Sequence, residues 1–151
     1  MKETDNLVKE LLVNPSSIRT IATEIYENMD AETTVIGVPE AATPLAAAVS
    51  VLFSVPMMLL RKFPKNDEYI RNKEYRRCTL IEDVTSTCES VIKYIQILEE
   101  NNFQVDKVII VIDEGCKAKE LIKKDVKVLY DVESFLDKFY PSSLEMREKG
   151  R

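Results

Sequence analysis

The sequence predicts an α/β protein built on a mostly parallel, doubly wound sheet. Segments of β-branched and aliphatic residues alternate with segments of helical periodicity, as expected when each strand is followed by a crossover helix. Residues 107–113 form an almost continuous β-branched run, which is typical of a strand buried on both faces of a parallel sheet. The chain has 151 residues without repeat or linker, so we expect one domain over residues 1–140 and a polar tail over residues 141–151.

The amino-terminal part of the chain predicts two helices and a strand. Residues 7–13 have an amphipathic pattern, and Asn14-Pro15 then starts a second helix. Aliphatic residues recur at helical spacing over residues 18–25 and give this helix a buried face. Residues 33–38 form a short apolar run that ends in a glycine and a proline, which indicates a buried strand.

The middle of the chain predicts a helix, a strand and an irregular segment. Pro44 suits the first position of a helix that runs to about Phe53 and is rich in alanine and valine. Residues 55–62 are expected to form the next strand. Residues 63–77 are polar and charged without sustained periodicity, which indicates a long exposed loop or a β-ribbon.

The carboxy-terminal part continues the alternation of strands and helices. Residues 79–84 predict a strand and residues 90–101 a helix, followed by the strand at 107–113 and a short helix. A strand at 126–130 and a last helix at 132–139 complete the fold. The inner face of the helix at 90–101 is expected to consist of Val91, Tyr94, Ile95 and Leu98.

Composition and charge exclude several classes of function. The net charge is −5 with acids and bases interspersed, which predicts neither a nucleic-acid partner nor binding to an anionic membrane. No apolar run approaches bilayer-spanning length, and a charged segment instead of a secretory signal follows Met1. Cys78, Cys88 and Cys116 lack metal-ligand spacing and the chain has no histidine, so we expect no protein-held metal. Unpaired cysteines are typical of a reducing cytoplasm, where we expect the protein to reside.

The stretch from Cys78 to Ser90 is the most informative motif. A short β-favouring run ends in Glu82-Asp83, a hydroxyl-rich turn follows, and a helical pattern begins at Ser90. Open α/β sheets bind phosphorylated ligands at this kind of strand–loop–helix junction. An acidic pair in a loop is otherwise most often a solvated strand end, and the junction favours a site. Because histidine is missing, chemistry here has to use carboxylates, lysine or positioning.

Four stretches, taken in order, resemble the type I phosphoribosyltransferases and, within them, the orotate phosphoribosyltransferase family. Residues 37–46 look like the pyrophosphate loop and the following helix. Residues 56–65, which contain Arg-Lys-x-x-Lys, look like the start of the flexible catalytic loop. Residues 80–90 are similar to the diphosphoribose-binding motif, and residues 108–113 to the strand that ends near the base. The likeness spans residues 14–139.

The resemblance implies a reaction and a set of site residues. Pyrophosphate would be displaced from phosphoribosyl pyrophosphate by a pyrimidine nitrogen, through an oxocarbenium-like state that positioning and charge stabilise. Glu82 and Asp83 would hold the ribose hydroxyls, Mg²⁺ would be carried mainly by the substrate, and the basic cluster would neutralise pyrophosphate, partly across a homodimer interface. The implied catalytic residues are Lys65 and Asp83. The implied substrate-binding residues are Arg61, Lys62, Glu82, Thr85, Ser86, Thr87 and Ser90.

Several residues depart from the family pattern. Cys88 replaces the phosphate-loop glycine, which readily adopts a positive φ, and Glu40 adds a negative charge to the pyrophosphate loop. Glu114 stands where the family has an arginine that pairs with orotate. If Glu89 pointed inward, about 5 Å from a phosphate, repulsion would cost on the order of 3–6 kcal/mol at an effective dielectric of about 20. Pointing outward, it would be a favourable first-turn acid.

Two functions therefore remain open. One is an orotate phosphoribosyltransferase-like enzyme of pyrimidine nucleotide metabolism with an impaired site. The other is a non-catalytic member of the same fold that senses a nucleotide or binds a partner. The segment at 63–77 is shorter than the family's mobile loop, and we expect the chain to lack the N-terminal hood that covers the base. The identity of the base or nucleotide, and whether a partner supplies the hood, stay open.

Overall fold

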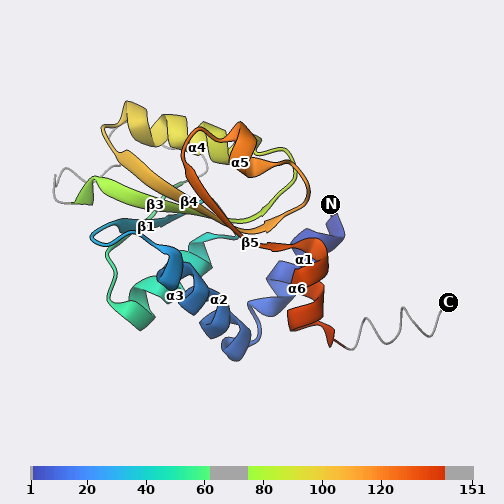
Figure 1. Cartoon of the computed structure of the whole chain (residues 1–151). Coiled ribbons are helices and arrows are strands. Elements are labelled where there is room, and N and C mark those ends of the chain that lie inside the picture. The colour runs from blue at the N-terminus through green and yellow to red at the C-terminus, as the bar shows by residue number, and fades with distance from the viewer. Residues whose placement is uncertain (1, 62–74, 142–151) are drawn as a thin grey trace.

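The computed structural model describes residues 2–61 and 75–141, which form one parallel sheet covered by helices (Figure 1). The sheet has five strands in the order β2-β1-β3-β4-β5. The strands are β1 (Thr34–Gly37), β2 (Met57–Met58), β3 (Arg77–Thr85), β4 (Gln104–Asp113) and β5 (Asp125–Asp131). The helices are α1 (Lys2–Leu11), α2 (Pro15–Asn28), α3 (Thr43–Phe53), α4 (Glu89–Glu100), α5 (Ala118–Leu121) and α6 (Val132–Phe139).

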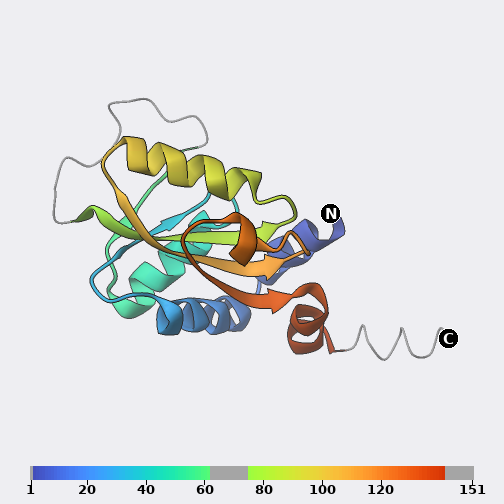
Figure 2. The ribbon, with the colours of Figure 1, turned by 45° about the horizontal axis from the view of Figure 1, so that its top comes forward.

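Helices cover both faces of the sheet, as the doubly wound prediction requires. Helices α4 and α5 lie over one face, and α1, α2, α3 and α6 lie against the other (Figures 1 and 2). Every strand pair is parallel, so each connection has to cross from one end of the sheet to the other. Residues 108–112 of β4 are all fully buried, which confirms that this run is a strand covered on both faces.

Most predicted elements are confirmed, with shifts at their ends. Helix α2 begins at Pro15, where the Asn14 side chain accepts the Ser16 N–H at 3.0 Å, and α6 has the predicted bounds. The predicted strand at 55–62 is wrong in length, because β2 has two residues. Strand β1 offers only four residues to pair with, and the Pro56 carbonyl accepts the Val35 N–H at 2.8 Å just before β2 begins.

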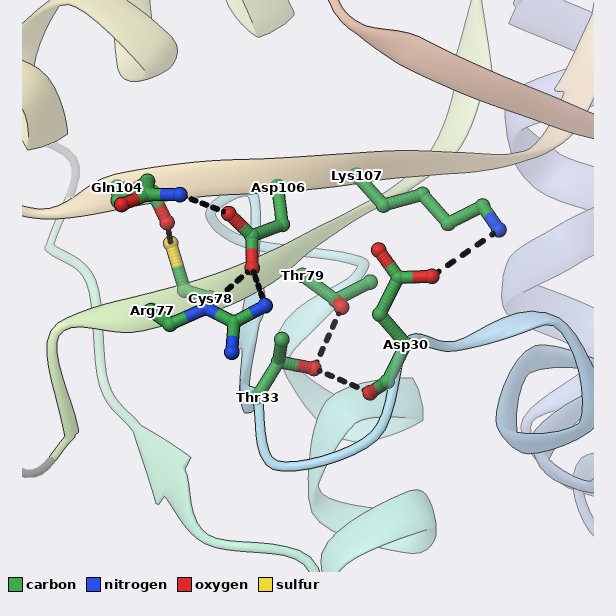
Figure 3. A network of polar contacts seen from close by, with 8 residues as sticks. All are labelled: Asp30, Thr33, Arg77, Cys78, Thr79, Gln104, Asp106 and Lys107. Carbon is green, nitrogen blue, oxygen red and sulfur yellow. Dashed lines mark hydrogen bonds and ion pairs between the residues drawn. The ribbon is translucent and has the colours of Figure 1, made fainter.

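A polar network closes the sheet at the amino ends of β3 and β4 (Figure 3). The Arg77 guanidinium donates to Asp106 Oδ2 at 2.8 Å, and the buried hydroxyls of Thr33 and Thr79 lie 2.8 Å apart. Burial raises the pKa of the neighbouring Cys78 thiol to about 12, with a further contribution from the Asp106 carboxylate. This amino edge is structural, because its polar groups bond to one another.

Among the described residues, none of the helices combines the length and the apolar character that a membrane span requires.

Candidate functional site

The carboxyl ends of β1, β3 and β4 lie side by side and bring three loops together; we call this side the carboxyl edge. The Val38 N–H donates to the Ile81 carbonyl at 2.8 Å, which joins the start of the loop after β1 to β3. The Glu114 N–H donates to the Thr85 carbonyl at 2.9 Å, which joins the loop after β4 to the end of β3. The four stretches singled out in the sequence thus meet at one edge, except for the part of residues 56–65 that lies outside the described residues.

The acidic pair at the end of β3 is buried. Glu82 is 5% exposed and Asp83 8% exposed, so the interpretation as a solvated strand end is wrong. The Asp83 N–H donates to Glu82 Oε1 at 3.0 Å. Burial raises the pKa of the Tyr94 hydroxyl on α4, and the negative charges of Glu82 and Glu40 raise it further. Glu82 and Asp83 are successive residues of β3, so strand alternation directs their side chains to opposite faces of the sheet.

The loop between β3 and α4 is held by its own hydroxyl groups. Thr85 Oγ1 accepts the Cys88 N–H at 3.0 Å, and Thr87 Oγ1 accepts the Glu89 N–H at 3.4 Å. Cys88 precedes the first turn of α4 with φ 63° and ψ 3°, which is the left-handed conformation. Each threonine accepts a hydrogen bond here and still has its own O–H to donate. The loop is therefore pre-shaped at the amino end of a helix, where an anion is favoured.

The structure describes most of the remaining predicted site residues, and two of them lie outside its described ranges. Ser86 is half-buried in the same loop, and Ser90 is exposed in the first turn of α4. Arg61 is exposed just beyond β2, while Lys62 and Lys65 lie outside the described residues. Glu89 is exposed in the first turn of α4, which fits the outward orientation. The residues that the structure brings together at the end of β3 are Glu82, Asp83, Thr85, Ser86, Thr87 and Ser90.

The loop after β1 folds tightly over the end of its strand. A Cβ atom on Gly37 would lie 2.5 Å from the Ala42 carbonyl oxygen, so only glycine fits there. The Thr43 N–H donates to the Glu40 carbonyl at 3.2 Å, and the Pro39–Glu40 peptide bond is cis. Glu40 itself is exposed. The loop therefore presents backbone and a carboxylate to the carboxyl edge.

Asp113 shapes the turn after β4. Its Oδ1 accepts the Gly115 and Cys116 N–H groups, both at 2.8 Å, and its Oδ2 accepts the Ala118 N–H at 3.0 Å. The Glu114 Oε1 atom is buried, and no hydrogen-bond partner for it is found within residues 2–61 and 75–141. Both carboxylate oxygens of Asp113 thus accept backbone N–H groups of the turn, whereas the buried Glu114 Oε1 has no such donor among the described residues.

Cys88 and Cys116 are joined by a disulfide, so the prediction of three unpaired cysteines is wrong. The argument for a reducing compartment loses that support. The structure pairs Thr85 with Asp113 at the ends of neighbouring parallel strands, and each cysteine follows one of these residues by three positions (88 − 85 and 116 − 113). Equal offsets from paired strand ends bring two residues close together. In the part of the chain that the structure describes, no three His, Cys, Asp or Glu side chains gather as a metal site.

Comparison with known proteins identifies the family. A family model described as the phosphoribosyl transferase domain matches residues 8–143. The chain belongs to this family. Among curated members, the orotate phosphoribosyltransferase of Methanocaldococcus jannaschii is 34% identical over 125 residues, which cover 78% of this chain and 70% of that protein. The resemblance inferred from the four motifs is therefore confirmed, and this phosphoribosyl transferase domain is orotate phosphoribosyltransferase-like.

Solved structures confirm the fold. Orotate phosphoribosyltransferase from Aeropyrum pernix has a TM-score of 0.71 at 24% identity and covers 86% of this chain and 80% of its own. The Mycobacterium tuberculosis orotate phosphoribosyltransferase, in complex with phosphoribosyl pyrophosphate, has a TM-score of 0.67 at 19% identity, with 83% and 80% covered. The phosphoribosyl transferase domain described here therefore has the type I phosphoribosyltransferase fold.

Proposed function

We propose that this protein binds phosphoribosyl pyrophosphate at the carboxyl edge of β3 and that its transfer to orotate is impaired. One observation carries the proposal: the buried Glu82-Asp83 pair directly precedes a hydroxyl-lined loop at the amino end of α4. A carboxylate has lone pairs for several hydrogen bonds, and each of the two can accept one from a ribose hydroxyl. The neighbouring loop offers the O–H groups of Thr85 and Thr87 to a 5′-phosphate, at the amino end of α4 where an anion is favoured.

The rest of the substrate would extend from this point toward the loop after β1. Pyrophosphate would be neutralised by Arg61, Lys62 and Lys65, with a second copy of the chain contributing across a homodimer interface. Mg²⁺ would enter with the substrate. In the reaction, the bond from C1′ to the pyrophosphate oxygen breaks and a bond from C1′ to the base nitrogen forms. Asp83 and Lys65 would stabilise the charges that develop.

Glu114 supports the proposal that orotate is a poor acceptor. It follows β4 at the base end of the proposed site, and its Oε1 oxygen is buried. Orotate carries a carboxylate, and two carboxylates about 4 Å apart repel by about 4 kcal/mol at an effective dielectric of 20. A base that presents an N–H group in place of a carboxylate would instead satisfy Glu114.

Calorimetric titration of the full chain with phosphoribosyl pyrophosphate and Mg²⁺ tests the proposal. Micromolar binding is expected for the wild type and for Glu100→Gln, which removes an exposed carboxylate at the far end of α4. The double variant Glu82→Gln/Asp83→Asn keeps the shapes of both side chains and should lose binding while it retains a cooperative melt. Wild-type protein that fails to bind at millimolar ligand would refute the proposal.

A non-catalytic role is the second candidate function. Its support is that the Cys88 and Glu89 N–H groups already bond to threonines of the loop, and that Cys88 is cross-linked to Cys116 in the loop after β4. Such a site would sense a phosphorylated nucleotide without turning it over. Binding without pyrophosphate release, across orotate, uracil and cytosine, would favour this second function, and release with any of these bases would favour the enzyme.

A further inference from the structure

The disulfide joins the two loops that end β3 and β4. Cys88 and Cys116 are separated by 28 residues and their Cα atoms are 6.5 Å apart, within the span of native disulfides. Each cysteine is also bonded to the end of its own strand: the Cys88 N–H donates to Thr85 Oγ1, and the Cys116 N–H to Asp113 Oδ1. The cross-link thus fixes the loop proposed to hold the 5′-phosphate against the neighbouring turn.

The cross-link also restrains an unfavourable backbone conformation. Cys88 has φ 63°, a region that residues with a Cβ atom adopt at a cost and glycine adopts freely. With the disulfide intact, Cys88 is held there, and the Glu89 N–H that follows it stays directed at Thr87 Oγ1. Without it, right-handed and extended conformations become available to Cys88, and they turn the Glu89 N–H away from Thr87. The state of the disulfide therefore sets the order of the loop.

The two sulfur atoms differ in access, and the third cysteine does not compete with them. Cys88 is 1% exposed, whereas Cys116 is half-buried, so a small thiol reaches the Cys116 sulfur first. The thiolate released on Cys88 lies at the amino end of the 12-residue α4, where the helix dipole favours negative charge. Cys78 is buried at the amino edge, away from both, and burial raises the pKa of its thiol to about 12.

We propose that Cys88 and Cys116 form a reversible thiol–disulfide couple that controls ligand binding at the loop after β3. The inference rests on the proposed function. Reduction consumes two molecules of a small thiol: the first breaks the bond between the cysteines and forms a mixed disulfide, and the second releases it. The products are two protein thiols and one small-molecule disulfide. Oxidation by a small-molecule disulfide such as glutathione disulfide is the reverse. The oxidised protein has the ordered loop and binds more tightly.

The test compares both states of the full chain. Protein oxidised with glutathione disulfide and protein reduced with a phosphine are titrated with phosphoribosyl pyrophosphate and Mg²⁺. We expect oxidised protein to bind about tenfold more tightly. This ratio corresponds to the free-energy cost of placing a residue with a Cβ atom in the left-handed conformation, which reduced protein has to meet when it binds. Peptide mapping without reductant should recover residues 88 and 116 in one cross-linked fragment. Cys78→Ala should keep the full redox response.

Two variants separate the cross-link from the conformation. Cys116→Ala should bind like reduced wild type under both conditions, because it cannot form the bond. Cys88→Gly should bind with one affinity in both conditions and more tightly than Cys116→Ala, because glycine adopts the left-handed conformation unaided. Equal affinity of oxidised and reduced wild type, or no cross-linked fragment after oxidation, would overturn this inference alone. No binding in either state would overturn it together with the proposed function.

Discussion

Replacing Gly37 by alanine tests how tightly the loop after β1 is built. The new Cβ would lie 2.5 Å from the Ala42 oxygen, 2.6 Å from the Ala42 carbonyl carbon and 2.7 Å from the Thr43 nitrogen. All three are backbone atoms, so no side-chain rotation relieves the clash. Reaching an ordinary contact of 3.4 Å requires the loop to move by about 0.9 Å. We expect Gly37→Ala to lower the free energy of unfolding by about 2–3 kcal/mol.

Thermal and urea unfolding measure this loss. For a chain of this length, about 2–3 kcal/mol corresponds to a melting temperature lower by about 4–12 °C. Gly115→Ala is the matched control, because Gly115 has φ 98° and nothing lies within 4 Å of its added Cβ. It should cost about 1 kcal/mol through backbone conformation alone. A Gly37→Ala protein that melts within about 2 °C of wild type would refute the steric reasoning.

Three further predictions concern single side chains. Glu89→Gln should change the dissociation constant for phosphoribosyl pyrophosphate less than about threefold in calorimetry, because Glu89 is exposed; a tenfold gain would show that it faces the ligand. Thr79→Val should lower the free energy of unfolding by about 1 kcal/mol in urea, because it removes the buried bond to Thr33, and a neutral result would contradict that bond. Burial raises the pKa of the Cys78 thiol from 9.0 to about 12, so between these pH values the folded state keeps a proton that the unfolded state loses. The free energy of unfolding should therefore fall as the pH rises from 9.0 to about 12, and it should fall less steeply in Cys78→Ala. Equal slopes of unfolding free energy against pH in the two proteins would contradict the raised pKa.

The fold was predictable because its strands and helices have different periodicities. The β-branched run at 107–113 predicts a strand and the helical spacing over 90–101 predicts a helix. The observed β4 and α4 lie close to these predicted ranges. The length of β2 was not predictable from its apolar residues, because pairing depends on the partner strand. Only Val35 and Ile36 of β1 pair with β2, and no local pattern at residues 55–62 reports this.

The candidate site was predictable in its residue types and less so in its contacts. Glu82 and Asp83 are recognisable because they end a strand before a hydroxyl-rich turn. That Thr87 accepts the Glu89 N–H depends on the left-handed conformation at Cys88, which the residue type disfavours. The disulfide depends on the register between β3 and β4, and register is a property of tertiary packing that single-segment patterns do not contain.

The two outer strands of the sheet limit how copies of the chain can associate. In the described residues, β2 offers only two residues at one border, and β5 carries Asp125, Lys127 and Asp131 along the other. Short and charged borders are poor templates for adding a foreign strand, so they protect against aggregation by sheet extension. A dimer of this protein would therefore form through side chains on helices and loops. Its interface could then be redesigned by surface substitutions that leave the backbone ladder intact.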